Sequence, residues 1–549
     1  MRPGAIAGTR STIIISATPT PNGDLHVGHM AGPYLAGDVY ARYLRAIGQP
    51  VVYSTCTDDS QTYVVSTARK RGMTPEELCA RSTAAIQRSV HAMGISMGPL
   101  PPIDHGYRAA VLDFVTALHE AGRFTLRTVK LPYAERAGSY LADGLVKGEC
   151  PACFAESCGG SCEACGHPNH FDELGDPRST MDPSDPVSYR EATVLVLPME
   201  RYRERLVTYY KERENRWRPH SMQLIREILS RPLPDVPVTF PTGWGVPAPF
   251  PETPGQVLYP WVEAMPASMY STWWAARDQG LDPGAVDELW RAEHGAELVY
   301  FHGFDNVYFW GMVDLVLLMA HGERYVLPDT NICNEFYELE NEKFSTSRNH
   351  VIWSTDLVAQ VPRDLVRFYL ALTCPENQRT NFSRDALEKV TSQRLVQPWN
   401  ALADHIDGVL LGLDPDTALP VTDAGRHRAA AMVRRFRLCY ELPTFSLHRA
   451  ADGIMTQLDR LHTIAFGDLE GPDAAKQLGD LLLQIRTLLA CAAPILIDAA
   501  ATATAAGTRL SLTGDGDGLG VHEVTPLRLP RLHTTVDVGT SPQLVGTFT

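Results

Sequence analysis

The stretch "STIIISATPTPNGDLHVGHMAGPYLAGDVYARYLRAIGQPVVYSTCTDD", residues 11–59, decides the expected fold. It begins with an apolar, β-branched run that Pro and Gly stop, and helical spacing of apolar residues then continues to Gly48. A second run, "PVVYSTCT", ends at Asp58-Asp59. Strand, helix and strand in this order predict the opening of a parallel α/β sheet, whose ligands lie at the carboxyl ends of the strands. Pro33 lies early in the helical stretch and predicts a kink there.

The composition describes an ordinary globular protein with more than one module. The 549 residues exceed what one hydrophobic core usually serves, and 44% are hydrophobic and 21% charged. The net charge of −15 gives no global basic surface, so any polynucleotide contact depends on a local patch. The most apolar tract, "LLLQIRTLLACAAPILID", is interrupted by Arg486 and Pro494. We therefore expect no membrane span and a cytoplasmic protein.

The remaining patterns change several times along the chain. Residues 130–235 look like an insertion, because a cysteine-rich knob is followed by a Pro-rich stretch. Strand character returns in "AELVYFHGFDNVYFWGMVDLVLL", residues 296–318. From about 384 to about 507 the pattern is helical without strand character, and the last forty residues predict a loop-rich tail.

The first motif that carries chemistry is "TPTPNGDLHVGH", residues 18–29. His26 and His29, spaced i and i+3 at a helix start, would project together toward a ligand held at the positive end of the helix. Gly28 between them lets a flat group such as a purine approach the backbone. Taken alone, this four-residue pattern fits two surface histidines near a turn equally well.

The second motif is "KFSTSR", residues 343–348, which looks like a phosphate-handling loop that has lost one of its lysines. The two motifs together resemble the H-I-G-H and K-M-S-K-S signatures of class I aminoacyl-tRNA synthetases, in the right order and separated by an inserted domain. The resemblance is closest to the methionyl-tRNA synthetases, and it covers nearly all of residues 12–500. Co-occurrence of the two motifs is much more specific than either motif alone.

The cysteine-rich segment "KGECPACFAESCGGSCEACG" resembles the zinc knob of that family. Its C-x2-C-x8-C-x2-C pattern brings together Cys150, Cys153, Cys162 and Cys165. Thiolates at this spacing close a tetrahedral structural site and leave no position open for catalysis. The alternative is a metal-free knob of reduced cysteines. Cys158 is a spare thiol that could compete for a ligand position.

The resemblance implies an α/β fold. It consists of a Rossmann-like, parallel-sheet nucleotide-binding catalytic domain, an inserted connective domain with the zinc knob, and a C-terminal α-helical domain like those that bind anticodons. The expected boundaries are the first half of the catalytic domain at 1–129, the connective domain at 130–235, the second half of the catalytic domain at 236–330, a linker domain with the signature loop at 331–383, the helical domain at 384–510 and the tail at 511–549.

In such synthetases the carboxylate of the amino acid attacks the α-phosphorus of ATP, with Mg²⁺ present, and releases pyrophosphate. The protein aligns two anions and stabilises the charge that develops on the phosphoryl oxygens. The resemblance implies that His26 and His29 contact the phosphates and that Lys343 binds the leaving pyrophosphate, so these three residues are the expected catalytic residues. The expected ATP-binding residues are His26, Gly28, His29, Asp305, Asn306, Lys343, Ser345 and Arg348.

The expected amino-acid pocket departs from the family in several walls. Thr18 and Thr20 stand where methionyl enzymes have leucine and tyrosine, and Trp310 stands where they have histidine. Because one methylene in an apolar pocket is worth about 1–3 kcal/mol, these changes predict an amino acid smaller or more polar than methionine. A repacked pocket that still takes methionine is the alternative. The expected amino-acid-binding residues are Thr18, Thr20, Asp58, Trp261, Ala264, Met265, Ser268 and Trp310, with Asp58 receiving the ammonium group unless it is only a solvated acid at a strand end.

Two positive charges of the family pattern and two residues that read the anticodon are missing. Thr346 and Phe304 stand where lysines are frequent, and each lost phosphate contact weakens transition-state binding by roughly 1.5–3 kcal/mol. In the helical domain Asn400 survives, but Asp404 replaces an arginine and the tryptophan of the family is absent. An aspartate that faces RNA repels phosphate. The sequence therefore predicts a reaction that does not need tRNA.

Three functions remain open. The leading one is a synthetase paralogue that activates an amino acid with ATP and transfers the acyl group to a small-molecule amine, hydroxylamine or hydroxyl, as in natural-product pathways that lead to hydrazines. The second is a methionine–tRNA ligase that charges tRNA. The third is a catalytically inactive binding protein, which the kept His26, His29, Asp58 and Lys343 disfavour.

Overall fold

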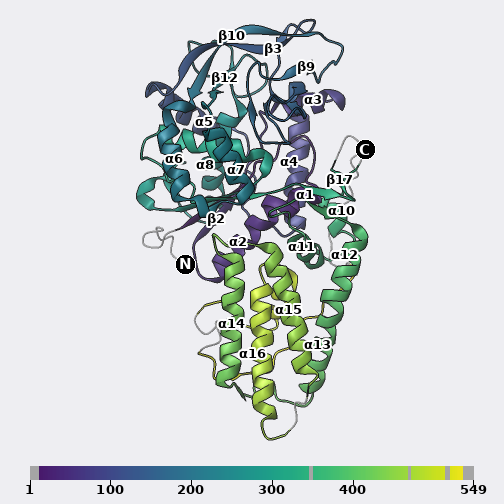
Figure 1. Ribbon diagram of the computed structural model, residues 1–549. Coiled ribbons are helices and arrows are strands. Elements are labelled where there is room, and N and C mark those ends of the chain that lie inside the picture. Colours follow the sequence, from purple (N-terminus) through teal and green to yellow (C-terminus); the bar gives the residue numbers. More distant parts are fainter. Residues whose placement is uncertain (1–10, 345–349, 468–470, 514–519, 536–549) are drawn as a thin grey trace. The chain divides into compact units, whose positions relative to one another are not determined.

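The computed structural model describes residues 11–344, 350–467, 471–513 and 520–535 (Figure 1). The chain divides into two compact units, each assembled from segments that are far apart in sequence. Among the described residues, no helix has both the length and the apolar character that crossing a bilayer requires. Unit 1 comprises residues 1–24, 49–88 and 96–336, and unit 2 comprises residues 25–48, 89–95 and 337–549.

The core of unit 1 is a parallel sheet of four strands, in the order β15 (Thr330–Asn334), β14 (Glu297–Gly303), β1 (Thr12–Ser16) and β2 (Val51–Ser54). All three strand pairs are parallel. Every residue of β1 and β2 is buried, as is usual for strands of a parallel sheet. The α/β fold with a parallel sheet is thus confirmed.

Helices surround this sheet in unit 1, and the long helix α8 (Pro260–Asp278) packs against β2 and β1. The strand character expected as far as residue 318 is wrong beyond Gly303, because residues 307–320 are helical. All fourteen side chains of residues 307–320 are buried, and an apolar run without a polar face does not distinguish a strand from a buried helix. Other helical elements of unit 1 are α3 (Thr62–Lys70), α5 (His105–Glu120), α6 (Arg203–Glu212), α7 (Pro219–Leu229), η7 (Phe304–Asn306), the π-helical η8 (Phe309–Val313) and α9 (Asp314–Ala320).

The insertion forms a second sheet, which is antiparallel. Its strands follow the order β11 (Asp235–Pro237), β10 (Val187–Pro198), β3 (Thr125–Ala134) and β4 (Ser139–Tyr140). Strands β3 and β10 pair along ten residues. The cysteine-rich knob lies between them in sequence and contains the short strands β5 (Val146–Glu149), β6 (Glu156–Cys158), β7 (Gly160–Ser161), β8 (Pro168–Asn169) and β9 (Gly175–Ser179).

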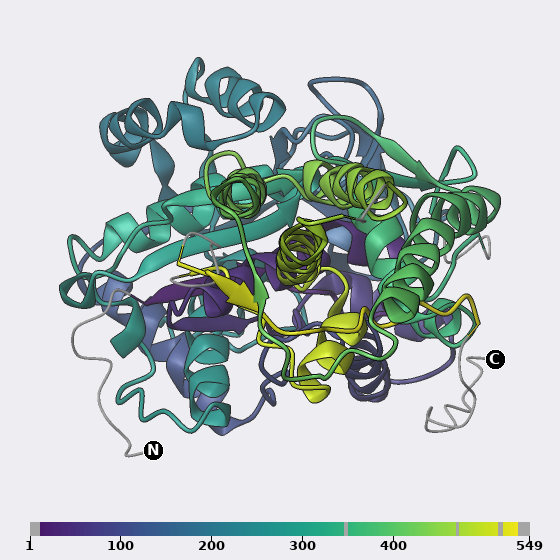
Figure 2. The same ribbon diagram turned by 90° about the horizontal axis from the view of Figure 1, so that it is seen from below.

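Unit 2 is mostly helical. Helices α13 (Gln397–Val409), α14 (Asp423–Tyr440), α15 (Leu447–Ala465) and α16 (Ala474–Ala492) run side by side (Figure 1). Viewed along these helices, the short strand β20 (Glu523–Val524) lies beside β19 (Leu419–Pro420) (Figure 2). The remaining elements are α10 (Ser354–Val358), α11 (Arg363–Leu372), α12 (Arg384–Thr391), η9 (Ser392–Val396), α17 (Ile497–Ala505) and the small sheet of β16 (Tyr337–Leu339), β17 (Glu342–Lys343) and β18 (Thr380–Phe382).

The N-terminal helical stretch also belongs to unit 2. It consists of α1 (Val27–His29), the π-helical η1 (Met30–Tyr34) and α2 (Leu35–Ala46). Gly32 leaves the helical region, with φ −93° and ψ −116°, directly before Pro33. The kink predicted at Pro33 is therefore present.

A fully buried arginine ties the distant segments of unit 2 together. Arg367 of α11 forms an ion pair of 2.6 Å with the equally buried Asp38 of α2. Its other N–H groups donate to the carbonyl oxygens of Met93, Pro494 and Ile495, at 3.1, 2.8 and 2.9 Å. Because burial of an unpaired charge is costly, this network holds segments around residues 38, 93, 367 and 495 in one folded unit.

Candidate functional site

The two histidines of the first motif lie together at the start of α1. His26 is the N-cap of the helix, and its Nδ1 accepts a hydrogen bond of 3.1 Å from the N–H of Gly28. The N–H of His26 donates in turn to Nδ1 of His29, at 3.2 Å. The two rings stack with 3.8 Å between their centroids. The sequence H-V-G-H thus fixes both imidazoles through backbone hydrogen bonds.

These contacts also fix where the proton of each imidazole lies. Desolvation and the nearby His29 lower the pKa of His26 well below its usual value. The ring of His29 keeps part of its surface open to solvent, yet desolvation by the surrounding protein lowers its pKa to about 4. Both rings are neutral at pH 7, and since each Nδ1 accepts a hydrogen bond, each Nε2 carries the proton. The pair therefore offers two Nε2–H donors to an anionic ligand.

The beginning of the second motif lies next to this pair. The ring of Phe344 stacks on His26, with 4.4 Å between centroids and 4° between planes. A Cβ atom at Gly28 would lie only 3.0 Å from His26 and 3.1 Å from Phe344, so the glycine leaves room for both rings. Lys343 is exposed in β17, opposite Glu338 of β16. We call residues 26–29 with Phe344 the histidine segment. Ser345, Thr346 and Arg348 of the motif lie outside the described residues.

In unit 1 the other expected residues follow the carboxyl ends of adjacent strands. Thr18 and Thr20 come after β1, Asp58 after β2, and Asp305 with Asn306 after β14. The sheet therefore brings these three loops to one edge, as the position of a ligand site in a parallel sheet requires. A Cβ atom at position 303, which is glycine, would lie 2.6 Å from a carboxylate oxygen of Asp305, so that side chain folds back over its own strand end.

Sequence reasoning missed a second acid near Asp58. Glu263 of α8 is 2% exposed and accepts a hydrogen bond of 2.7 Å from the hydroxyl of Tyr107. Its Oε2 has no hydrogen-bond partner among the described residues. Burial raises the pKa of Glu263 to about 7 and, together with the charge of Glu263, raises the pKa of Asp58. The signal in the sequence was a glutamate inside the apolar stretch "YPWVEAMPAS".

Helix α8 carries four of the expected pocket residues. Trp261 stacks on Phe309 of η8 with 3.7 Å between ring centroids. The hydroxyl of Ser268 donates to the carbonyl oxygen of Ala264 at 3.0 Å, so this hydroxyl does not need a ligand as its acceptor. Ala264 and Ser268 are buried, and Trp261 is partly exposed.

Tyr300, a residue of β14, contacts both Met265 and Trp310. The hydroxyl of Tyr300 is 3.8 Å from the sulfur of Met265, and its ring meets that of Trp310 edge-on at 4.9 Å. Met265 and Trp310 are almost fully buried. We call the set Trp261, Ala264, Met265, Ser268 and Trp310 the apolar wall; all five belong to unit 1.

Phe304 stands at the position where the family often has a lysine, and its side chain packs inside the protein. Phe304 is 2% exposed, and its ring stacks on His220 with 3.9 Å between centroids and 9° between planes. His220 in turn lies 2.8 Å from a carboxylate oxygen of Glu335. The structure therefore offers no phosphate-binding side chain at position 304.

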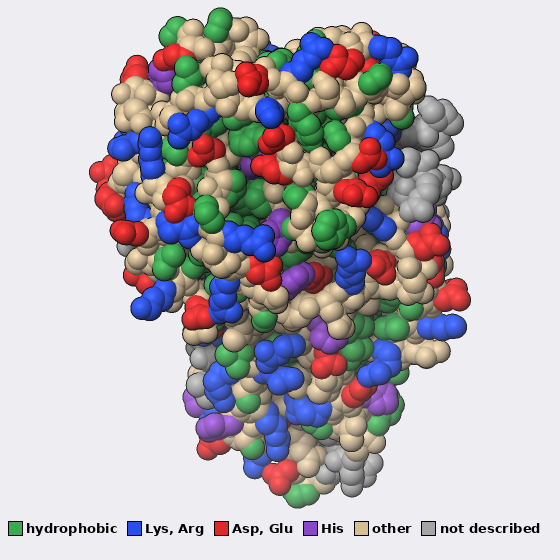
Figure 3. Space-filling view, turned by 45° about the horizontal axis from the view of Figure 1, so that its top comes forward, with side chains coloured by type: hydrophobic (Ala, Val, Ile, Leu, Met, Phe, Trp, Pro, Cys, Tyr) green, Lys and Arg blue, Asp and Glu red, His purple; other side chains and the backbone are tan. Residues whose placement is uncertain are grey.

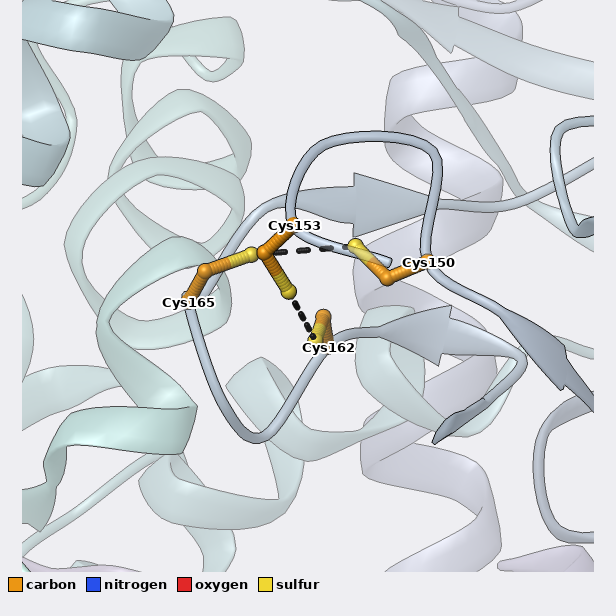
Figure 4. A group of neighbouring side chains, drawn as sticks. All are labelled: Cys150, Cys153, Cys162 and Cys165. Carbon is orange, nitrogen blue, oxygen red and sulfur yellow. Dashed lines mark hydrogen bonds between the residues drawn. The ribbon is translucent and has the colours of Figure 1, made fainter. Parts of the chain in front are cut away.

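The four cysteines of the knob converge on one point (Figure 4). Their sulfur atoms all lie within 4.8 Å of one another, and the pairs Cys150–Cys165 and Cys153–Cys162 are each 3.7 Å apart. Four sulfurs placed 2.3 Å from a zinc ion at tetrahedral corners lie about 3.8 Å apart, so the cluster fits zinc. Cys158 is not part of the cluster. A structural zinc fits here because all four tetrahedral positions are taken by the chain.

The face of α13 that carries Asn400 and Asp404 contacts residues 527–532, which we call the C-terminal segment. The Asn400 side chain donates to the carbonyl oxygen of Leu532 at 2.8 Å and accepts from its N–H at 2.9 Å. Arg531 forms ion pairs with Asp404 at 2.6 Å and with Asp407 at 2.8 Å. The residue kept from the family pattern and the residue that replaces its arginine are therefore both engaged within the chain.

Helix α14 presents a different surface. Arg428, Arg434, Arg435 and Arg437 of this helix are exposed. Arg437 is paired with Glu441 at 2.9 Å. Figure 3 shows Lys and Arg side chains gathered over the helical part of the molecule. These four arginines are spread around the exposed side of the helix, and we call them the arginine row. They form a local basic patch of the kind through which an acidic protein can contact a polynucleotide.

Comparison with known proteins gives the family. Residues 12–406 match the family described as tRNA synthetases class I (M). The Methionine–tRNA ligase of Porphyromonas gingivalis is 32% identical over 378 residues, which cover 68% of this chain and 54% of that protein. The Methionine–tRNA ligase of Cytophaga hutchinsonii is 29% identical over 501 residues, 87% of this chain and 71% of that protein. The chain thus spans about half the length of the first of these relatives.

The fold matches solved structures over nearly its whole length. Mycobacterium tuberculosis methionyl-tRNA synthetase bound by methionyl-adenylate superposes with a TM-score of 0.72 at 19% identity, covering 96% of this chain and 99% of that chain. The family expected from the two motifs is confirmed. The chain belongs to the class I tRNA synthetase family and is similar to its methionyl-tRNA synthetases.

Proposed function

We propose that the protein is an ATP-dependent ligase that activates an amino acid to an aminoacyl adenylate. The observation that carries this proposal is the pair of neutral imidazoles in the histidine segment, whose Nε2–H donors are held in place before a ligand arrives. Such donors stabilise charge that develops on phosphoryl oxygens, since they do not reorganise during the reaction. Lys343, Ser345 and Arg348 would bind the pyrophosphate of Mg-ATP, and Asp305, Asn306 and Gly28 would border its nucleoside.

The amino acid would bind in unit 1. Asp58 and Glu263 would supply carboxylates for the α-ammonium group, whose positive charge would offset the burial that raises the pKa of both acids. Thr18, Thr20 and the apolar wall would surround the side chain. The replaced wall residues support an amino acid other than methionine. Zinc in the knob would have a structural role, because the cluster leaves no position open for a substrate.

The first candidate acceptor of the acyl group is tRNA. The relatives named above are methionine–tRNA ligases, and they favour this acceptor over the small molecule expected from the sequence. The arginine row of α14 adds a specific observation in its support.

The second candidate acceptor is a small-molecule amine, hydroxylamine or hydroxyl. It is favoured by the contacts of Asn400 and Asp404 with the C-terminal segment, since groups already paired within the chain are not available to read a base. Asp404 would also repel phosphate if Arg531 moved away.

Amino-acid-dependent exchange of pyrophosphate into ATP, across a panel of amino acids, tests the activation step. Exchange with at least one amino acid is expected; absence of exchange with all of them would refute the proposal. Adding total tRNA and measuring acid-precipitable acylated RNA then separates the acceptors. Charging at a rate near that of activation identifies tRNA, and activation without charging, with acyl transfer to added hydroxylamine, identifies a small acceptor.

The arginine row provides a sharper version of the second step. Reversing two charges in Arg434→Glu/Arg435→Glu should reduce charging and leave pyrophosphate exchange unchanged if tRNA contacts α14. Arg231→Glu, an exposed position in unit 1, is the matched control. Unchanged charging in the double variant would remove α14 from the acceptor site.

A further inference from the structure

One buried acid of unit 1 has no role in the chemistry described so far. Asp314 is the first residue of α9 and is 2% exposed. It interrupts the apolar run "YFWGMVDLVLLMA", residues 308–320. Among the described residues, no hydrogen bond or ion pair to its carboxylate is present. Burial alone raises the pKa of Asp314, without a compensating cation.

The position of Asp314 connects it to the apolar wall. It follows Trp310 by one helical turn, and residues at this spacing share one face of a helix. Burial, and after it the charge of Asp314, raises the pKa of Tyr300. The Tyr300 hydroxyl contacts Met265, and the Tyr300 ring contacts Trp310. Helix α9 packs against α8, which carries the rest of the wall. Asp314 therefore continues the buried helix face of Trp310, on the helix that packs against α8.

An acid in this place has to be explained, because it destabilises the free protein. Burial of a carboxylate without a partner is among the most costly arrangements in a folded chain. An asparagine or a leucine would fill the same space without that cost. A ligand that carries a positive charge would offset this cost when it pairs with the carboxylate of Asp314.

We propose that Asp314 selects the amino acid by receiving the cationic end of its side chain, so that the substrate is a basic amino acid. This inference rests on the proposed function and narrows it. Asp58 and Glu263 would take the α-ammonium group, and Asp314 would take the second ammonium at the far end of the side chain. A neutral side chain of equal length would leave the carboxylate unpaired, which is how the site discriminates.

Binding of free amino acids without ATP tests the inference independently of catalysis. Calorimetric titration would compare 2,4-diaminobutyrate and ornithine with norvaline and norleucine, their neutral counterparts of equal length, and would include lysine and methionine. At least one basic amino acid should bind about tenfold or more tightly than every neutral one, as a charge-assisted hydrogen bond implies. Equal or tighter binding of a neutral amino acid overturns the proposal without any variant.

Asp314→Asn sharpens this experiment. The variant should lose about tenfold or more in affinity for the preferred basic amino acid and change by less than about threefold for neutral ones. Its melting temperature should equal or exceed that of the wild type, since an unpaired buried charge has been removed. Asp278→Asn, at the exposed end of α8, is the matched control. A lower melting temperature together with unchanged selectivity would assign Asp314 a structural role instead.

Pyrophosphate exchange separates failure of this inference from failure of the proposed function. No exchange with any amino acid refutes the function. Exchange with neutral amino acids only refutes the role of Asp314 and leaves the function standing.

Discussion

The histidine segment and the apolar wall are built in opposite ways. In the histidine segment, backbone hydrogen bonds fix each polar group, and Gly28 and Phe344 hold the rings in place. In the apolar wall, side chains pack on one another, and the hydroxyl of Ser268 is satisfied by its own helix. A wall of this kind can exchange residues without breaking hydrogen bonds, whereas the histidine segment cannot. We therefore expect the histidine segment to determine which reaction occurs, and the apolar wall to determine which amino acid binds.

Loss of zinc should produce the largest effect and should damage only the unit that carries the wall. Cys162→Ser should abolish metal binding and unfold the knob, because structural zinc contributes on the order of 10 kcal/mol. Zinc analysis and hydrogen exchange would measure this. We expect about one zinc per chain in the wild type and faster exchange in residues 146–179 of the variant, with unit 2 unchanged.

Cys158→Ser is the control, because Cys158 lies outside the cluster. This variant protein should retain its zinc. Zinc retained in Cys162→Ser, or none in wild-type protein purified without chelators, contradicts the assignment.

Removal of either imidazole should lower turnover for every amino acid alike. His26→Ala and His29→Ala should each reduce pyrophosphate exchange at least about tenfold, because each removes a preorganised donor. His427→Ala, an exposed histidine of α14, serves as control. The expectation is wrong if either variant changes the order of preference among amino acids and leaves the overall rate of pyrophosphate exchange unchanged.

Changes in the apolar wall should alter the preference among amino acids and leave ATP binding unchanged. Trp310→Phe should alter the preference among amino acids by several-fold, about 1 kcal/mol, and leave the KM for ATP unchanged. Trp290→Phe is a matched control, because Trp290 is equally buried in unit 1 but lies outside the wall. An unchanged preference together with a higher KM for ATP would assign Trp310 to the nucleotide.

The smallest effect is expected at α13, which should influence neither the reaction nor the choice of amino acid. Asn400→Ala removes two hydrogen bonds to Leu532 and should lower stability by about 1–2 kcal/mol without changing pyrophosphate exchange. Gln393→Ala, an exposed residue of η9, is the control. Thermal unfolding and exchange assays on the same samples would show whether the two properties separate.

The features that could be predicted from the sequence are those that depend on residues close together in the chain. The β-branched run of β1, the spacing of His26 and His29 and the four cysteines each depend on near neighbours, and all three form the expected local structure. The features that were missed depend on pairs far apart in sequence. The contacts of Phe344 with His26 and of Leu532 with Asn400, and the packing of α9 with its Asp314 against α8, require the tertiary fold, which no local periodicity contains.

Arg367 has a consequence for anyone who divides this chain. Its partners come from α2, from the residue that follows α4 (Pro75–Ala92), and from the turn between α16 and α17. The C-terminal helical region therefore does not contain all the partners that this buried arginine needs. A fragment that starts at residue 337 or 384 would lack Asp38 and Met93, and the first of these fragments would expose a guanidinium made for burial. Gene fusion, domain exchange and expression of separate parts must therefore keep residues 25–48 with the C-terminal half, although almost three hundred residues separate them.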